Sequence, residues 1–150
     1  MKKSISVLVM LIVLSTCFIT TVSALTSNYS FEFEVSLSGR SNGISYNLSS
    51  GNLAVSGSWR AGYPMGTNNV NSPLIPVTMQ LITWEWWSVL DRQVDSLTLP
   101  SARIYAYNQY SSYASYTGNM TVPSTGKYYL RFSSQLDGII KTGSGTLVQN

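Results

Sequence analysis

Hydrophobic and polar residues alternate along YSFEFEVSL, residues 29–37. Aromatic and aliphatic side chains occupy the odd positions, and serine and glutamate occupy the even ones. A period of two over this length is typical of a β-strand with one buried face and one solvated face. The pattern therefore predicts a strand that sends Glu32 and Glu34 into solvent.

The same alternation returns in short segments separated by turn residues. ISYNLS (44–49) and LAVSGSW (53–59) each predict a strand, with Gly57 as the site of a bulge. The other strand candidates are LIPVTMQLITWEWWSVL (74–90), LTLP (97–100), ARIYAY (102–107), NMTVP (119–123), GKYYLRFSSQL (126–136) and IIKTGSGTLVQ (139–149). Asp137-Gly138 predicts a two-residue hairpin turn between the last two strands.

About eight short strands divided by Gly, Pro and Asn turns are typical of a β-sandwich. We therefore expect a single all-β domain, an antiparallel sandwich with jelly-roll or Greek-key connections. DRQVDS (91–96) is interpreted as a break after the longest strand. The long segment RAGYPMGTNNVNSP (60–73) is interpreted as a crossover between the two sheets, with a functional loop as the alternative.

Glu85 lies among three of the four tryptophans, in TWEWW (83–87). The apolar positions of residues 75–81 set an inward frame that, if continued, would bury this glutamate. An unpaired buried carboxylate costs several kcal/mol. We therefore expect the frame to shift, through a β-bulge or a strand break near residues 82–83.

The shifted frame assigns the tryptophans to faces. Trp84 and Trp86 would lie in the core, where each indole contributes about 4–6 kcal/mol at about 25 cal/mol/Å². Trp87 would share the solvated face with Glu85. A flat ring beside a carboxylate is a platform on which a sugar can stack, so the pair is a candidate binding site. The alternative is that another strand or a loop covers Trp87.

A second aromatic segment, YAYNQYSSYASY (105–116), repeats tyrosine every three residues. The repeated positions are Tyr107, Tyr110, Tyr113 and Tyr116. A period of three fits neither a strand nor an α-helix, and Tyr with Ser and Asn is typical of adaptable binding loops. The segment therefore predicts a binding loop, and the alternative of a tyrosine-rich edge strand packed over the core stays open.

The N-terminal residues have the three parts of a secretory signal peptide. Lys2 and Lys3 precede an apolar run over residues 5–19, and Val22-Ser23-Ala24 offers a small-residue cleavage site. The run is shorter than the roughly 20 residues that a membrane-spanning helix needs. We expect a signal peptide at 1–24, a domain at 25–150 and a secreted, extracellular protein; a retained anchor and lipidation at Cys17 are the weaker alternatives.

The charge and the cysteine content limit the classes of partner and the source that we expect for this protein. Lys2 and Lys3 belong to the signal segment, so their removal lowers the net charge from +3 to +1. A nucleic-acid-binding surface needs a basic patch, and this composition predicts none. The sole cysteine, Cys17, also lies in the signal segment, so residues 25–150 have no disulfide, which favours a bacterial source.

Residues 25–150 contain few of the side chains that enzymes use in catalysis, because they contain neither histidine nor cysteine. This excludes Ser-His and Cys-His nucleophiles and the usual zinc sites. Glu85 is the one acid in an aromatic setting, whereas Glu32 and Glu34 fit a solvated strand face and Asp91 and Asp95 fit a solvated turn. We therefore expect a protein that is not an enzyme and that holds no metal and no cofactor.

VPSTGKYYLRFSS (122–134) resembles a strand entry of bacterial pre-peptidase C-terminal-type domains, and FEFEV (31–35) is compatible with their first strand. Those domains are secreted β-sandwiches attached to exported hydrolases. TWEWW stands where their aspartate-rich strand would be expected. The resemblance implies a fold class and export, and it implies no ligand and no catalytic residue.

These observations favour a secreted, non-catalytic binding module for a cell-surface or extracellular polysaccharide. Its expected contact surface consists of Trp87, Glu85, Tyr110, Tyr113 and Tyr116.

The alternative is a membrane-active secreted protein of toxin or bacteriocin type. Its low charge and alternating strands are compatible with a membrane hairpin formed by residues 44–59. A structural or immunity partner with a flat protein interface is a third interpretation, because the same aromatic residues suit protein contacts.

Overall fold

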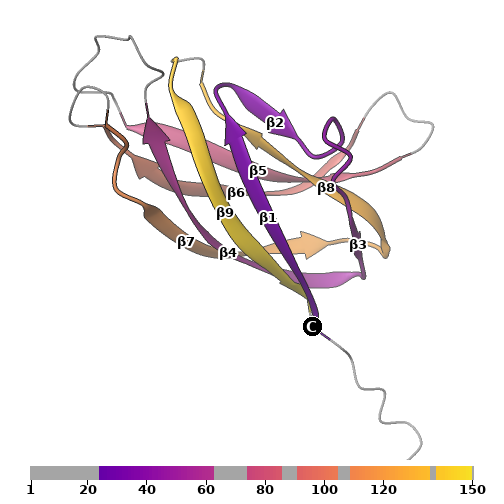
Figure 1. Cartoon of the computed structure of the whole chain (residues 1–150). Coiled ribbons are helices and arrows are strands. Elements are labelled where there is room, and N and C mark those ends of the chain that lie inside the picture. The colour runs from indigo at the N-terminus through magenta and orange to yellow at the C-terminus, as the bar shows by residue number, and fades with distance from the viewer. Residues whose placement is uncertain (1–23, 63–73, 86–90, 105–108, 136–137, 150) are drawn as a thin grey trace, which may run out of the picture.

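The computed structural model describes residues 24–62, 74–85, 91–104, 109–135 and 138–149. Its described residues form nine strands in two antiparallel sheets that pack face to face (Figure 1). The strands are β1 (Leu25–Phe33), β2 (Ser36–Ser38), β3 (Tyr46–Leu48), β4 (Gly51–Gly62), β5 (Ile75–Thr83), β6 (Gln93–Ala102), β7 (Ala114–Val122), β8 (Gly126–Ser133) and β9 (Ile140–Gln149). The predicted all-β antiparallel sandwich is confirmed.

One sheet has the strand order β1-β9-β4-β7, and the other has the order β2-β8-β5-β6, with β3 also paired to β8. Most links therefore pass from one sheet to the other. The link from β4 to β5 is one of them, which agrees with the crossover expected for residues 60–73, although residues 63–73 lie outside the described part of the chain.

The alternation of residues 29–37 is confirmed in its first half. Tyr29, Phe31 and Phe33 are buried on the inner face of β1, and Glu32 is exposed. The chain then leaves this sheet, and β2 pairs with β8 in the other one. Val35 lies in the link and is exposed, so the single nine-residue strand that the pattern predicts is wrong.

The two strands of each predicted hairpin belong to different sheets. β8 and β9 do not pair with each other, so Gly138, which has a φ of 67°, lies in a link between the two sheets and not in a hairpin turn. Asp137 lies outside the described residues. β3 and β4, which contain the hairpin expected at residues 44–59, likewise belong to different sheets, with β3 on β8 and β4 on β7 and β9.

Glycines at the centre of the four-stranded sheet make room for aromatic rings. Tyr29 is directly opposite Gly145, Gly145 is opposite Gly57, and Gly57 is opposite Tyr116. Opposite residues in an antiparallel pair face the same side. The two tyrosines therefore extend across the glycine backbones, and their hydroxyl oxygens lie 2.7 Å apart in the core.

This row corrects the bulge expected at Gly57. The pairing of β4 with both neighbours runs through Gly57 without a register shift. A Cβ atom there would lie 2.7 Å from the hydroxyl oxygen of Tyr116, which is too close for a side chain. Glycine is present because Tyr116 occupies the space, not because the strand bends.

The sandwich closes where β6 meets β7. The Asp95 carboxylate on β6 accepts a hydrogen bond from the backbone N–H of Thr121 at 2.6 Å. Nearby, the Leu97 side chain lies over Gly118 of β7. β6 runs continuously from Gln93 to Ala102, so the break expected at residues 91–96 holds only for residues 91–92, and the division between LTLP and ARIYAY is wrong.

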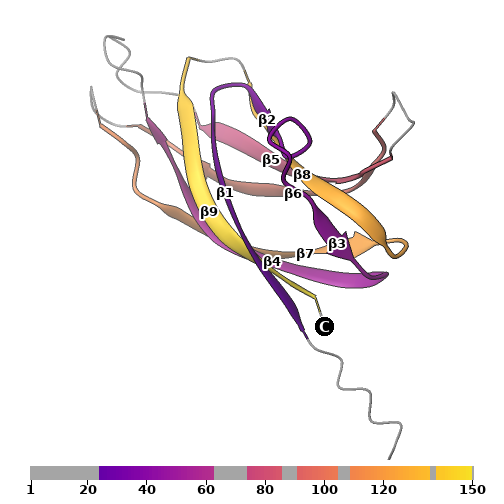
Figure 2. The same ribbon diagram turned by 45° about the vertical axis from the view of Figure 1, so that its right-hand side comes forward.

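On the opposite side, the chain passes from β1 in one sheet to β2 in the other (Figure 2). In this link, the carbonyl oxygen of Glu34 accepts a hydrogen bond at 2.6 Å from the Nζ of Lys141, a buried residue of β9. Within the described residues, no helix is long and apolar enough to cross a membrane.

Candidate functional site

The four repeated tyrosines separate into different environments. Tyr107 lies outside the described residues. Tyr110 and Tyr113 are the most exposed of the described aromatic residues, at 49% and 59%. Tyr116 belongs to β7 and is buried against Tyr29, so its expected place on a contact surface is wrong.

Arg60 contacts both exposed rings. Its guanidinium carbon is 4.2 Å from the ring centroid of Tyr110 and 4.9 Å from that of Tyr113. Trp59, the preceding residue, is fully buried and lies opposite Ala114, so Arg60 points outward beside Tyr113. Tyr110, Tyr113 and Arg60 form a surface that we call the tyrosine–arginine patch.

The backbone of β4 positions Tyr110. Gly62 and Tyr110 form an isolated β-bridge, and a Cβ atom on Gly62 would collide with the Tyr110 ring. Ser111 secures the segment: its N–H donates to the carbonyl of Ala61 at 2.7 Å, and its Oγ accepts from the N–H of Ala61 at 3.0 Å. The ring is thus held flat over a glycine by backbone pairing on its C-terminal side.

The electrostatic setting of Arg60 is unusual. Its Nε is buried and has no hydrogen-bond partner among the described residues. No ion pair joins Arg60 to a described acidic residue, and the nearest acid in its register row, Glu32, is two strands away. Contacts between a guanidinium and aromatic faces contribute about 0.5–1 kcal/mol each at exposed sites. The cation is therefore held by the rings and not by an acid.

This arrangement suits a ligand with both apolar and hydroxyl surfaces. Tyrosine presents a flat apolar ring with a polar tip and loses little conformational entropy when it binds. The guanidinium adds N–H donors in a fixed plane. A sugar ring, with a C–H face and a rim of hydroxyl groups, matches these features.

Trp84 does not lie in the core, contrary to expectation. β5 keeps a regular register with β8 through Thr83, so Trp84 follows Ile82 onto the outer face of the five-stranded sheet. The expected irregularity does occur, between Leu81 and Ile82, but in the pairing with β6. The extra residue lies on β6, and therefore the faces of β5 do not change.

Cations and a buried phenol cover Trp84 on this outer face. The Lys127 Nζ is 4.2 Å and the Arg40 Cζ is 5.7 Å from its ring centroid. Its ring meets that of the fully buried Tyr129 edge to face at 5.9 Å. The backbone N–H of Trp84 also donates to the backbone carbonyl of Lys127 at 2.8 Å.

Asp91 completes what we call the charged cluster, which consists of Arg40, Trp84, Asp91, Lys127, Tyr129 and Arg131. The Asp91 carboxylate forms an ion pair with Arg40 and lies 3.8 Å from the guanidinium of Arg131. Burial, and then the hydrogen bond to Asp91, raises the pKa of Tyr129. Asp91 was interpreted from sequence as a solvated turn residue, and its arginine partners are too distant in the chain for any local pattern to identify.

The expected contact surface is therefore not one surface. Glu85 is half-buried and follows the end of β5 that pairs with Tyr128, near the start of β8. Tyr110 lies at the other end of the sandwich, where β4 ends at Gly62 (Figure 1). A nine-residue strand is about 30 Å long. Trp87 lies outside the described residues.

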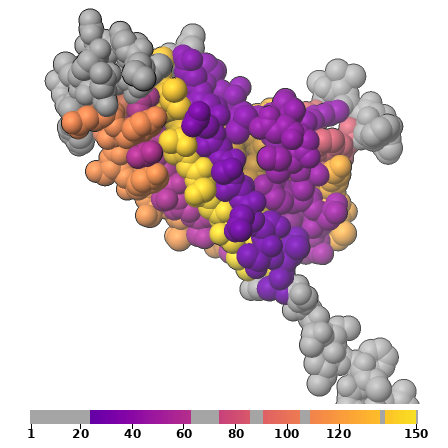
Figure 3. Space-filling view, viewed as in Figure 1, coloured from indigo at the N-terminus to yellow at the C-terminus, as the bar shows by residue number. Residues whose placement is uncertain are grey.

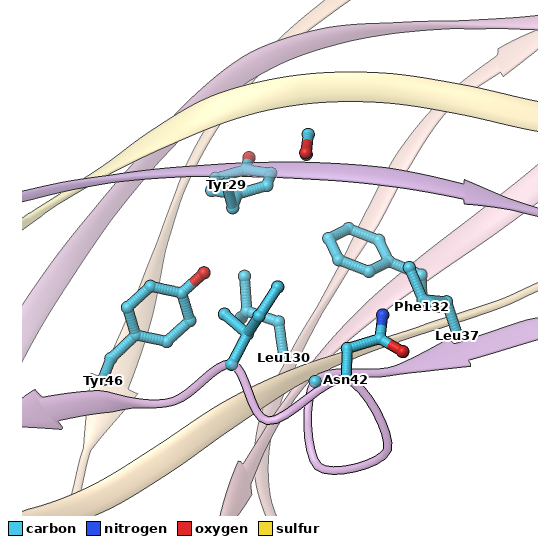
Figure 4. Close-up of a pocket in the computed structure, with 9 residues that line it drawn as sticks. Tyr29, Leu37, Asn42, Tyr46, Leu130 and Phe132 are labelled. Atoms are coloured by element: carbon cyan, nitrogen blue, oxygen red, sulfur yellow. The ribbon is translucent and has the colours of Figure 1, made fainter.

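A small crevice opens between β1 and the segment that links β2 to β3 (Figure 4). Tyr29, Tyr46, Leu37, Leu130 and Phe132 line it, and Asn42 lies at its mouth. Its volume of about 20 Å³ has room for about one water molecule. It does not accommodate a sugar ring.

Within the described part of the chain, no three residues among His, Cys, Asp and Glu come together as a metal site. The tyrosine–arginine patch is therefore the candidate site that the described residues support best.

No family model matches the chain, and no curated protein is similar to it in sequence. Among solved structures, the chain is similar to a mutant VP2 protein of infectious bursal disease virus in derived T=1 particles. This match has a TM-score of 0.46 and 12% identity, and it covers 85% of this chain and 32% of that chain. The chain thus spans about a third of the VP2 chain, and likeness at this level transfers no residue, ligand or assembly.

Proposed function

We propose that the protein is an exported, non-catalytic binding module that holds a cell-surface or extracellular polysaccharide on the tyrosine–arginine patch. The observation that carries this proposal is the pair of exposed tyrosine rings that both contact an arginine with no acidic partner among the described residues. Ordered rings bind with a smaller entropy cost than mobile ones.

Two features support export. Residues 1–24 have the pattern of a secretory signal peptide, and β1 begins at Leu25, directly after the expected cleavage site. The resemblance of residues 122–134 to pre-peptidase C-terminal-type domains points to the same destination. The alternative, a membrane-active protein, was based on a hairpin at residues 44–59, and the fold divides that segment between two sheets.

The proposal is tested by retention of the purified domain on insoluble chitin, cellulose and peptidoglycan. We expect wild type to be retained on at least one of them, and the double variant Tyr110→Ala/Tyr113→Ala to bind about tenfold more weakly or worse, since each tenfold is about 1.4 kcal/mol. Ile44→Ala removes a comparably exposed apolar side chain elsewhere and should bind as wild type does. Equal retention of wild type and the double variant, or no retention on any polymer, contradicts the proposal.

A further inference from the structure

The outer face of the four-stranded sheet is nearly free of charge. At every second position of residues 26–30 (β1), 142–148 (β9), 52–58 (β4) and 115–121 (β7), the outward residue is serine, threonine or asparagine, apart from Ala54 and Val148. We call this surface the neutral face. Figure 3 shows it, with β9 in yellow beside β1 in indigo.

Several polar side chains of the neutral face are ordered by one another. Thr146 Oγ1 donates to Asn28 Oδ1 at 3.3 Å, and Asn52 Nδ2 donates to Asn119 Oδ1 at 3.2 Å. Such contacts hold donors and acceptors in place before a ligand arrives. The outer face of the other sheet differs, because it carries the charged cluster.

The neutral face is continuous with the tyrosine–arginine patch. Arg60 is the next outward residue of β4 after Ser58, so the patch lies at one end of the face. Further along β4, Ala54 leaves a shallow hollow between Val148 and Asn119, its partners in register. Arg60 and Ala54 are six positions apart in β4, which corresponds to about 20 Å along the strand.

We propose that the polysaccharide is a neutral polymer that lies along β4 and β7, from the tyrosine–arginine patch across the neutral face to the hollow at Ala54. This inference rests on the proposed function. The hydroxyl groups of a neutral sugar can form hydrogen bonds with Ser, Thr and Asn side chains, which both donate and accept, in place of those they form with water. A charged sugar would lose hydration along a face that offers no counter-charge between Ser58 and Asn52. Arg60 is the cation at the end of the neutral face. Glu32, two strands away in the same register row, repels anions.

Chain length and charge are the properties to test. We would titrate the full domain with three neutral series: cello-oligosaccharides, N-acetylated chito-oligosaccharides and laminari-oligosaccharides, each as disaccharide and hexasaccharide. Oligogalacturonate is the acidic counterpart. We expect at least one neutral hexasaccharide to bind about tenfold more tightly than its disaccharide. Oligogalacturonate should bind more weakly than the neutral oligosaccharide of the same length.

Ala54→Lys fills the hollow and adds a charge, so it should remove the advantage of the hexasaccharide and leave the disaccharide affinity unchanged. Thr98→Lys, on an exposed position of β6, is the matched control and should change neither. Equal affinity for both lengths, an unaffected Ala54→Lys variant, or tighter binding of oligogalacturonate overturns this inference alone. Unchanged binding by Tyr110→Ala/Tyr113→Ala, or no binding of any oligosaccharide, overturns the proposed function as well.

Discussion

Tyr29 and Tyr116 extend toward each other from the two outer strands of one sheet, over Gly145 and Gly57. Burial raises the pKa of both phenols, and the hydrogen bond between them raises the pKa of Tyr29 further. Two residues were misread from sequence here for a single reason. Gly57 suggested a bulge and Tyr116 suggested a surface contact, because a local pattern does not show that one side chain fills the space left by the other.

Gly57→Ala should therefore destabilise the fold. A methyl group at this position meets the Tyr116 hydroxyl and a backbone carbonyl, and overpacking of this kind costs about 1–3 kcal/mol. Gly126→Ala is the control, because its Cβ would lie 3.7 Å from the nearest side chain, an ordinary contact. Urea unfolding measures both, and equal midpoints for the two variants would contradict the expectation.

The buried phenols also predict a loss of stability in alkali. Burial raises the pKa of Tyr29 and of Tyr116 above the ordinary value near 10. Above that pH the unfolded chain loses these protons and the folded chain keeps them, so the free energy of unfolding falls, by up to about 1.4 kcal/mol per pH unit for each phenol. Below that pH the contribution is fully present.

Unfolding by urea between about pH 8 and pH 11 measures this dependence. Tyr29→Phe removes one titrating group, so its free energy of unfolding should fall less steeply above pH 10 than that of wild type. Near neutral pH the variant should lose about 1 kcal/mol, because the hydroxyl of Tyr116 loses its partner. Identical slopes for the two proteins would show that Tyr29 does not contribute.

At the scale of elements, β5 shows how a strand adjusts to its neighbours. Its pairing with β8 is regular, and the irregularities lie opposite β6, which takes up the extra residues. The apolar frame of residues 75–81 was correctly read from sequence, and so was an irregularity near residue 82. Which neighbour absorbs it depends on residues far along the chain, and for that reason Trp84 was assigned to the wrong face.

The charged cluster should stabilise the fold around Asp91, which lies just before β6. Asp91→Ala leaves Arg40 and Arg131 without their shared carboxylate and Tyr129 without its acceptor. Because both arginines are more than a third exposed, solvent screens the pair, and we expect a loss of about 1–2 kcal/mol. Thermal unfolding measures it, with Arg103→Ala, an exposed arginine, as the control. A loss no larger than the control's would show that the cluster is not stabilising.

At the scale of the whole molecule, alternation and turn residues were sufficient to predict an antiparallel sandwich. They were insufficient to predict which sheet each strand joins, because that choice follows from contacts between distant segments. The residues of the candidate site, likewise, were only partly predicted from the sequence. Tyr110 and Tyr113 were identified from composition, whereas Arg60 was missed, since its contact with Tyr110 depends on the bridge between Gly62 and Tyr110.

The neutral face predicts that binding depends little on salt. Between about 0.01 M and 1 M ionic strength the screening length falls from about 30 Å to about 3 Å, which weakens attraction between charges at exposed sites. Retention on a neutral polysaccharide should therefore change less than about twofold over this range. Co-sedimentation with that polysaccharide at both salt concentrations measures it, and a steep decline in retention would contradict binding through a neutral face.

The contact between Asp95 and Thr121 also limits how copies of this chain can associate. The Asp95 carboxylate accepts a hydrogen bond from a backbone N–H that would otherwise be free to pair with a strand of another molecule. β6 and β7 also cover each other. β2 and β3, at three residues each, are too short to template a partner. β1 is left as the long exposed border, and two copies joined there through a twofold axis would form a closed pair that cannot extend into a fibre.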